Sequence, residues 1–259
     1  MKYLICVPWH KEEVKQQFLE AWSTKETNPL LVLQKDGGWF SCAKTKNMAI
    51  QKAKSLGAEI IIVLDSDCYP FLNTSLEEFA QSHIKALEDQ EVKLFEQVTN
   101  PASRGTPYFK RSIKMPVAAS MGYWENIPDR DAIAQLAHGA FTEMEFFKKI
   151  IFNKYFALSG MNLAFRTELS EWFEFIDVSR FDDIWMGWIA QRMAYANNYC
   201  FNLNGPTIRH ARQSNVWQNL RDEAKFLELN ETLWQSIYKS PANLNQLKNL
   251  VKSKIYGNE

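Results

Sequence analysis

The stretch Glu59-Ile60-Ile61-Ile62-Val63-Leu64-Asp65-Ser66-Asp67 decides the fold of this 259-residue chain. Its first part is a nearly continuous run of aliphatic residues, which is typical of a central parallel strand that is buried on both faces. Apolar residues at helical spacing precede it in residues 42–56, and Gly57 ends that segment. The three polar residues therefore lie where a buried strand ends.

Strands and helices alternate on both sides of this stretch. Residues 3–7 and 30–33 are expected strands, and residues 11–22 between them have a helical pattern. Later segments with the same signals are residues 116–124 and 162–165 as strands, 182–197 as a helix, and 217–253 as mostly helix interrupted at Pro241. This alternation predicts an α/β fold with an open, doubly wound sheet, whose ligands bind beyond the carboxyl ends of the strands. We expect residues 1–215 to form the catalytic domain and residues 216–259 a helical extension packed on it.

The composition excludes several classes of protein. Apolar residues make up 46% of the chain and aromatic residues 14%, so the chain can bury a large core. Lys and Arg together number 30, as do Asp and Glu, so no net charge favours nucleic acid or a membrane surface. The N-terminal apolar run is too short for a signal peptide or a membrane span, and we expect a soluble cytoplasmic protein. The four cysteines are scattered, which favours reduced, mostly buried thiols over disulfides or a zinc site.

Asp65 and Asp67 form an Asp-x-Asp motif. Two carboxylates two residues apart repel each other unless a cation lies between them or both reach water. Oxygen ligands suit Mg²⁺ or Mn²⁺, and such a metal can bridge a diphosphate and neutralise the charge that develops as a nucleotide leaves. The alternative is a solvated turn capped by Ser66 or Asp67, which is the more common origin of an isolated Asp-x-Asp. The buried strand before the motif favours the metal site.

The segment Leu64-Asp65-Ser66-Asp67-Cys68 resembles the acidic metal motif of the reversibly glycosylated polypeptides, the UDP-arabinopyranose mutase family. The resemblance continues in order over roughly residues 42–223. Its other matching segments are Arg104-Gly105-x-Pro107-x-x-x-Arg111, Pro116-x-Ala118-x-Ser120-x-Gly122-x-Trp124-x-Asn126-Ile127-Pro128-Asp129-x-Asp131-Ala132, Gly160-Met161-Asn162-Leu163-Ala164-Phe165, Arg180-Phe181-Asp182-Asp183-Ile184-Trp185-x-Gly187-Trp188, and His210 with Ser214-Asn215 and Asn219-Leu220. This resemblance implies a GT-A glycosyltransferase fold and UDP-sugar chemistry.

The resemblance also implies roles for single residues. Arg111 matches the family's self-glycosylated arginine, and His210 stands where a late loop supplies a metal ligand alongside Asp65 and Asp67. The residues expected to hold the nucleotide sugar are Asp65, Ser66, Asp67, Arg104 and Asn162.

Three features depart from the family pattern. Ser66 replaces the middle acid of a three-aspartate run, which leaves the metal site intact if the outer two acids bind the metal. One extra residue lies between Arg111 and Pro116, and the chain is shorter than the plant members.

Asp182 and Asp183 open an expected helix. Carboxylates at this position cap a helix and interact with its dipole, which stabilises it by about 0.5–2 kcal/mol. Near a sugar, the same carboxylates can orient a hydroxyl or stabilise the oxocarbenium-like centre that forms as the bond to UDP lengthens. Both interpretations stay open, and Asp183 is slightly favoured as the catalytic residue.

Arg104, Lys110, Arg111 and Lys114 form a basic stretch without acidic residues. Such a stretch is most often a solvated loop. It also fits phosphate binding, a glycosyl acceptor, or contact with a nucleic-acid backbone. The histidines that show no partner spacing and are expected to be structural are His10, His83 and His138.

Three functions remain open from the sequence. The first is a divalent-metal-dependent UDP-sugar mutase that breaks the anomeric C–O bond and isomerises the sugar ring, with UDP-arabinose as the favoured substrate. The second keeps the same donor site but transfers the sugar to a separate acceptor, such as a modified base in DNA. The third is a non-catalytic sugar-nucleotide sensor or assembly partner. The oligomeric state stays open, with a homo-oligomer among the options.

Overall fold

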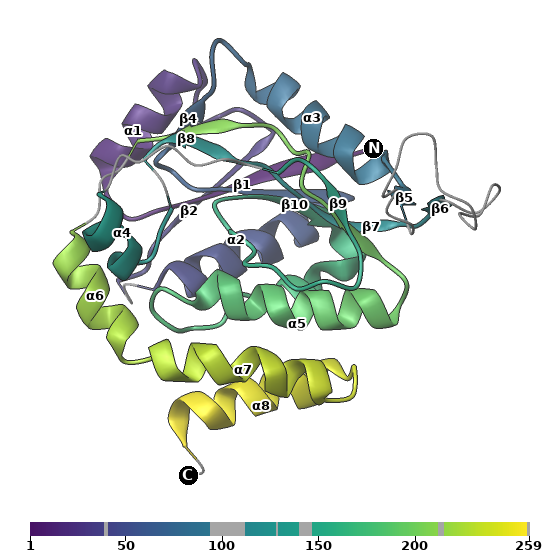
Figure 1. The fold of residues 1–259 in the computed structure, drawn as a ribbon. Coiled ribbons are helices and arrows are strands. Elements are labelled where there is room, and N and C mark those ends of the chain that lie inside the picture. The colour runs from purple at the N-terminus through teal and green to yellow at the C-terminus, as the bar shows by residue number, and fades with distance from the viewer. Residues whose placement is uncertain (39–40, 94–111, 128, 140–146, 212–214, 258–259) are drawn as a thin grey trace.

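The computed structural model describes residues 1–38, 41–93, 112–127, 129–139, 147–211 and 215–257. In this part of the chain a seven-stranded sheet forms the centre of the molecule (Figure 1). Its strands, in spatial order, are β2 (Leu31–Lys35), β1 (Tyr3–Trp9), β3 (Ile60–Leu64), β10 (Asn162–Arg166), β7 (Val117–Met121), β11 (Cys200–Asn202) and β9 (Ile150–Ile151). β1 pairs in parallel with β2 and β3, whereas β10 runs antiparallel between β3 and β7. The sheet is therefore mixed.

β3 is buried on both faces, as expected from its aliphatic sequence. Because successive side chains of a strand point to opposite faces, Ile61 and Val63 pack on one side with α2 (Cys42–Ser55) and α5 (Asp182–Ala196). Leu64 and its alternate neighbours pack on the other side with α1 (Glu12–Ala21) and α3 (Leu76–Glu88). Figure 1 shows these helices on the two faces of the sheet. Helices on both faces leave the strand ends as the open edge.

A small second sheet lies beside the carboxyl end of β3. In it, β12 (Ile208–His210) pairs antiparallel with β4 (Cys68–Pro70) and parallel with β8 (Trp124–Asn126). His210 and Cys68 are partners in this register, which brings His210 next to the Asp-x-Asp motif. A further pair, β5 (Glu91–Lys93) and β6 (Ser112–Lys114), forms a separate ribbon.

The expected single strand over residues 116–124 is wrong in one respect. The chain leaves the main sheet after β7, turns at Gly122, and continues as β8 in the small sheet. The turn is crowded, since a Cβ on Gly122 would lie 2.0 Å from the Pro206 carbonyl oxygen and 2.3 Å from Asn162 Nδ2. A second glycine, Gly205, meets it from the opposite segment, where an added Cβ would lie 2.8 Å from Gly122 N. Glycine at this crossing lets two backbones approach closely.

In the described part of the chain, three helices follow residue 215, and the last two of them pack against α5. The three helices are α6 (Val216–Ala224), α7 (Leu227–Lys239) and α8 (Leu244–Tyr256). Leu233 and Leu247 are fully buried in one cluster with Trp185 and Trp188 of α5. The remaining described helices are α4 (Ala132–His138), which contacts α6, and a 3-10 helix, Thr167–Phe173. Within the described residues, every helix is too short or too polar to cross a membrane.

The α/β architecture expected from the sequence, an open mixed sheet flanked by helices with a helical C-terminal part, is confirmed. The five strands of common direction place their carboxyl ends at one edge of the sheet. Because β10 is antiparallel to them, its first residue, Asn162, lies at that same edge. Residues far apart in the sequence therefore meet at the edge where ligands bind in open α/β sheets.

The close approach at Gly122 generates a stability prediction. Gly122→Ala should lower the free energy of unfolding by about 3 kcal/mol, because the new methyl group overlaps backbone and a buried amide that cannot move away. The matched control is Gly57→Ala, where φ is +77° but no atom lies within 4 Å, and there the cost should be only about 1–2 kcal/mol of backbone strain. Urea unfolding measures both. Equal losses in the two variants would contradict the crowded crossing.

Candidate functional site

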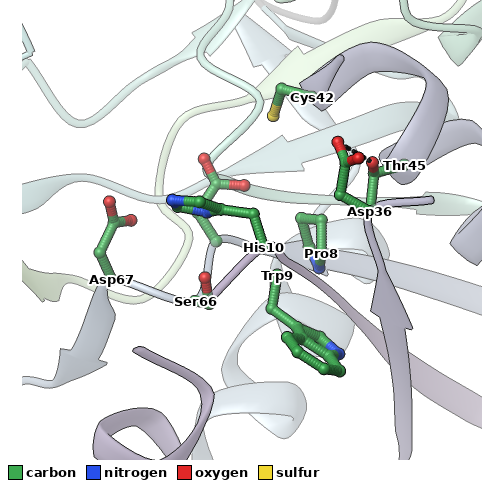
Figure 2. A pocket seen from close by; sticks show the side chains of 9 residues that line it. Pro8, Trp9, His10, Asp36, Cys42, Thr45, Ser66 and Asp67 are labelled. Carbon is green, nitrogen blue, oxygen red and sulfur yellow. Dashed lines mark hydrogen bonds between the residues drawn. The ribbon is translucent and has the colours of Figure 1, made fainter. Parts of the chain in front are cut away.

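A small pocket lies beyond the ends of β1, β2 and β3. Its volume is about 250 Å³. Figure 2 shows the side chains that line it, which are Pro8, Trp9, His10, Asp36, Cys42, Thr45, Asp65, Ser66 and Asp67. Asp36 is held in place there, because its carboxylate accepts hydrogen bonds from Gly38 N at 2.7 Å and from Thr45 Oγ1 at 3.3 Å. The pocket therefore gathers polar side chains from the ends of three strands.

A larger cleft of about 900 Å³ adjoins this pocket. Cys42, Asp65 and Asp67 line both spaces, so the strand-end acids stand at the junction. The far wall of the cleft comes from the start of α5, with Asp182 and Asp183. The cleft therefore brings together the two acidic groups that the sequence singled out separately.

Asp65 is engaged by a buried lysine. Lys46 Nζ lies 2.9 Å from Asp65 Oδ1 and donates to Oδ2 at 3.2 Å. The same ammonium group donates to the Gly160 carbonyl at 3.2 Å, and the Lys46 side chain is only 4% exposed. Burial opposes this charge, but the carboxylates of Asp65, Asp182 and Asp183 hold the pKa of Lys46 above its usual value. Lys46 is not among the site residues predicted from the sequence.

Asp67 and His210 face each other across the edge of the small sheet. His210 Nε2 lies 3.8 Å from Asp67 Oδ2, and each side chain is 14% exposed. His210 Nδ1 lies 3.0 Å from the Ile127 carbonyl oxygen. Because a carbonyl oxygen only accepts hydrogen bonds, Nδ1 must carry a proton to make this bond. Burial tends to lower the pKa of His210, but the hydrogen bond and charge of Asp67 raise it above its usual value.

This arrangement fits a divalent cation in its choice of atoms. When His210 is neutral, its Nε2 carries a lone pair directed toward a carboxylate, so two acceptors face each other and need a shared cation or proton. Carboxylate oxygen and imidazole nitrogen are both ligands of divalent metal ions such as Mn²⁺. In the described residues, however, no three acidic, histidine or cysteine side chains converge as a ready metal site. Of the predicted set of three ligands, the structure pairs Asp67 with His210 and turns Asp65 to Lys46.

Asp182 and Asp183 begin α5 and line the large cleft. Asp183 Oδ2 accepts a 2.7 Å hydrogen bond from Gly160 N. Burial, followed by the negative charge of Asp182, raises the pKa of Asp183 to about 7. Burial also raises the pKa of Asp182. A carboxyl group with a pKa of about 7, such as that of Asp183, can exchange a proton at neutral pH, which is the property of a general acid or base.

Asn162 has a different surrounding from the one expected for a donor-binding residue. Its side chain is fully buried. Asn162 Oδ1 lies 2.8 Å from His83 Nε2, and its Nδ2 donates to the Tyr123 and Pro206 carbonyls at 3.2 and 2.8 Å. His83 is equally buried, and burial lowers its pKa to about 4, so it is neutral and structural as expected. Asn162 ties β10 to the crossing at Gly122 and takes no place on the pocket wall.

The other predicted site residues divide into two groups. Ser66 is buried and lines the small pocket. Arg104 and Arg111 lie outside the described residues. His10, which the sequence analysis treated as structural, is exposed and lines the small pocket. Its position directly after the β1 strand was the signal that could have identified it, since parallel strand ends meet at one edge.

The described wall of the large cleft carries more carboxylates than cations. The carboxylates are Asp65, Asp67, Asp129, Asp131, Asp177, Asp182, Asp183 and Glu223, and the cations are Lys44, Lys46, Arg130 and Arg180. Ion pairs join Lys44 to Asp177, Lys46 to Asp65, and Arg180 to Glu223. The remaining negative charge favours a ligand that brings a cation or many hydroxyl groups.

Comparison with known proteins identifies relatives over much of the chain. The family model described as reversibly glycosylated polypeptide matches residues 54–251. A probable UDP-arabinopyranose mutase 1 from Pisum sativum is 30% identical over 183 residues, which cover 64% of this chain and 50% of the relative. UDP-arabinopyranose mutase 3 from Arabidopsis thaliana is 28% identical over 194 residues, covering 68% of this chain and 52% of the relative. The chain spans about half the length of the curated relatives it matches.

Solved structures show only remote similarity. TarS from S. aureus in complex with UDP-GlcNAc has a TM-score of 0.49 at 13% identity, covering 92% of this chain and 71% of TarS. GalNAc-T7 with UDP, GalNAc and Mn²⁺ has a TM-score of 0.45 at 11% identity, covering 98% of this chain and 54% of the other.

The raised pKa of Asp183 generates a stability prediction. The folded protein binds the Asp183 proton more tightly than the unfolded chain, so stability is fully present below the usual pKa of 3.8 and is lost as pH rises toward about 7. Asp183→Asn keeps an acceptor for Gly160 N and removes the titration. The free energy of unfolding of Asp183→Asn, relative to that of wild type, should therefore rise by about 2 kcal/mol between pH 5 and pH 8. Urea unfolding of the metal-free protein at both values tests this.

Asp177→Asn is the matched control for this measurement. Burial opposes ionisation of Asp177, but hydrogen bonds from Ser41 and Lys44 hold its pKa below the usual value. The Asp177 variant should gain nothing as pH rises. If wild type and Asp183→Asn instead differ by the same free energy of unfolding at every pH in this range, the raised pKa of Asp183 is contradicted. Burial and the nearby charges of Asp182, Lys46 and Asp129 would then leave its proton affinity unchanged.

Proposed function

The chain belongs to the reversibly glycosylated polypeptide family, and we propose that it binds a UDP-sugar at the junction of the two pockets and breaks the bond between sugar and diphosphate. The observation that carries the proposal is the position of Asp65 and Asp67, which line both spaces. The nucleoside lies in the small pocket, the diphosphate beside the acids, and the sugar in the large cleft. The nucleoside, diphosphate and sugar of a UDP-sugar thus correspond to the small pocket, the junction and the large cleft.

Asp67 and His210 hold a divalent cation, Mn²⁺ or Mg²⁺, in this proposal. Their facing acceptor atoms support it. Such a cation would neutralise the negative charge that develops on the diphosphate as it leaves. Asp65, fixed by Lys46, is then available on the nucleotide side of the junction as a hydrogen-bond acceptor. Ser66 lines the nucleoside pocket between them.

Asp183 acts at the sugar. Its carboxyl group is held by Gly160 N and has a pKa near neutrality, so it can give a proton to a leaving oxygen or take one from an attacking hydroxyl group. Asp182 supplies a second carboxyl group nearby, and in its ionised form this group stabilises positive charge at the anomeric carbon as the bond to the diphosphate lengthens. The acidic cleft wall adds to this stabilisation.

Ring interconversion of UDP-arabinose is the favoured reaction. The names of the relatives from Pisum sativum and Arabidopsis thaliana support a mutase. The carboxylate-rich wall also suits a sugar retained in the cleft, because hydroxyl groups donate to carboxylates. Arg111 receives the glycosyl group in this proposal. The cytoplasmic location and any self-association stay predictions.

Transfer to a separate acceptor is the second candidate. The large cleft, at about 900 Å³, is near the upper end for a drug-sized ligand and leaves space beside a sugar. The same wall weighs against DNA as that acceptor, since its carboxylates would repel phosphate groups. A neutral acceptor with hydroxyl groups fits the described surface better.

Loss of either proposed metal ligand tests the site. Asp67→Asn and His210→Ala should each weaken Mn²⁺-dependent UDP binding at least about tenfold, with near loss of turnover. Titration calorimetry with UDP, with Mn²⁺ and again with chelator, measures this. Glu77→Gln, an exposed acid on α3, serves as the control and should bind as wild type does. Wild-type binding that is equal in chelator would contradict a metal-dependent site.

Self-labelling separates the mutase from the transferase. Incubation with radiolabelled UDP-arabinose should label the protein, and Arg111→Ala should lose both the label and ring interconversion. Arg221→Ala removes an exposed arginine of α6 and should keep both. Label that persists in Arg111→Ala would reject that arginine as the acceptor. Transfer to an added acceptor without any labelled protein would favour the second candidate.

A further inference from the structure

Lys46 occupies an unusual place for a lysine. It lies on the inner face of α2 in line with Ala49, Ile50 and Ala53, which are all buried. Positions three, four and seven residues apart share one face of a helix, so Lys46 stands where an apolar residue is expected. A buried cation at such a position destabilises a core unless every donor is satisfied.

The ammonium group of Lys46 is held by a carboxylate, a carbonyl and an aromatic ring. Two contacts go to the carboxylate of Asp65, and a third goes to the Gly160 carbonyl. The ring of Phe175 lies below, with its centroid 5.0 Å from Nζ. Two of these contacts are hydrogen bonds, and the contact with Asp65 Oδ1 at 2.9 Å is an ion pair.

We propose that Lys46 is a positioning residue, which sets the carboxylate of Asp65 at the pocket junction through one ion pair that is anchored at Gly160 and Phe175. The inference rests on the proposed function, because it takes Asp65 as part of the nucleotide-binding wall. Lys46 itself touches no nucleotide. Its effect on UDP binding passes through Asp65.

The anchor for Lys46 is rigid. A Cβ on residue 160 would lie 2.4 Å from Phe175 Cε1, so Gly160 packs directly on the phenylalanine ring. Asn47, next to Lys46 in α2, exchanges hydrogen bonds with the Phe175 backbone at 2.8 and 2.9 Å. These contacts tie the helix, the glycine and the ring to one another. An Asp65 carboxylate bound to this unit keeps one orientation before any ligand arrives, which lowers the cost of binding.

A double-variant cycle tests the proposal. Lys46→Met should weaken Mn²⁺-dependent UDP binding at least about tenfold, because Asp65 loses its partner. In the Asp65→Asn background, adding Lys46→Met should change the UDP dissociation constant less than about twofold. Lys46→Arg keeps the charge and should bind better than Lys46→Met. Lys52→Met, an exposed position in the last turn of the same helix, should match wild type. Titration calorimetry well below the melting temperature gives all the constants.

Thermal unfolding separates this role from a purely structural one. Removing only Lys46 leaves an unpaired buried carboxylate, so Lys46→Met should melt lower than the double variant with Asp65→Asn. If Lys46→Met is too unstable to purify, Lys46→Arg and the double variant supply the binding comparison. A lowered melting temperature with an unchanged UDP dissociation constant would overturn the proposal, and so would additive losses in the double variant. If wild type shows no metal-dependent UDP binding, the proposed function itself is overturned. The comparison of melting temperatures does not depend on that function.

Discussion

The buried ion pair between Lys46 and Asp65 is the interaction on which the site depends. β3 is wholly apolar, and the first residue after it is a carboxylate that only partly reaches solvent. A negative charge at such a position is costly without a partner, and α2 supplies that partner from its inner face. Lys46 compensates the charge of Asp65, whereas Asp67, two residues later, faces His210. Because Lys46 pairs with only one of the two acids, Asp65 and Asp67 have different partners.

The direction of β10 explains how the second acidic group reaches the first. As an antiparallel strand beside β3, it begins at the edge where β3 ends, so Gly160, just before it, lies at the junction. The Gly160 carbonyl accepts from Lys46 and its N–H donates to Asp183. A single residue therefore connects the strand-end motif to the start of α5. This connection brings several carboxylates near one another, and burial raises the pKa values of Asp65, Asp182 and Asp183.

Much of this could be predicted from the sequence, and the gaps have physical causes. The aliphatic run of β3 fixed the central strand, and the resemblance of the following segments linked His210 to the Asp-x-Asp motif. Periodicity gave no hint that the strand over residues 116–124 divides, because the division depends on a backbone crossing with residues 205–206, far along the chain. Lys46 was overlooked although a charge on an apolar helical stripe is itself a signal. The helix α3 was also overlooked, although Ser75 and Glu78 form a capping box at its start.

The helices after residue 215 take part in the site and do more than cover a core. Glu223 of α6 is almost fully buried and accepts from Arg180 Nε at 2.9 Å and from Ala132 N at 2.7 Å. Arg180 has a φ of +67°, a left-handed conformation that costs a non-glycine residue about 1–2 kcal/mol. That strain persists only where surrounding contacts over-determine the backbone, and here the contact comes from α6. Because Arg180 lies two residues before Asp182, the C-terminal helices hold the turn that aims the acidic start of α5 into the cleft.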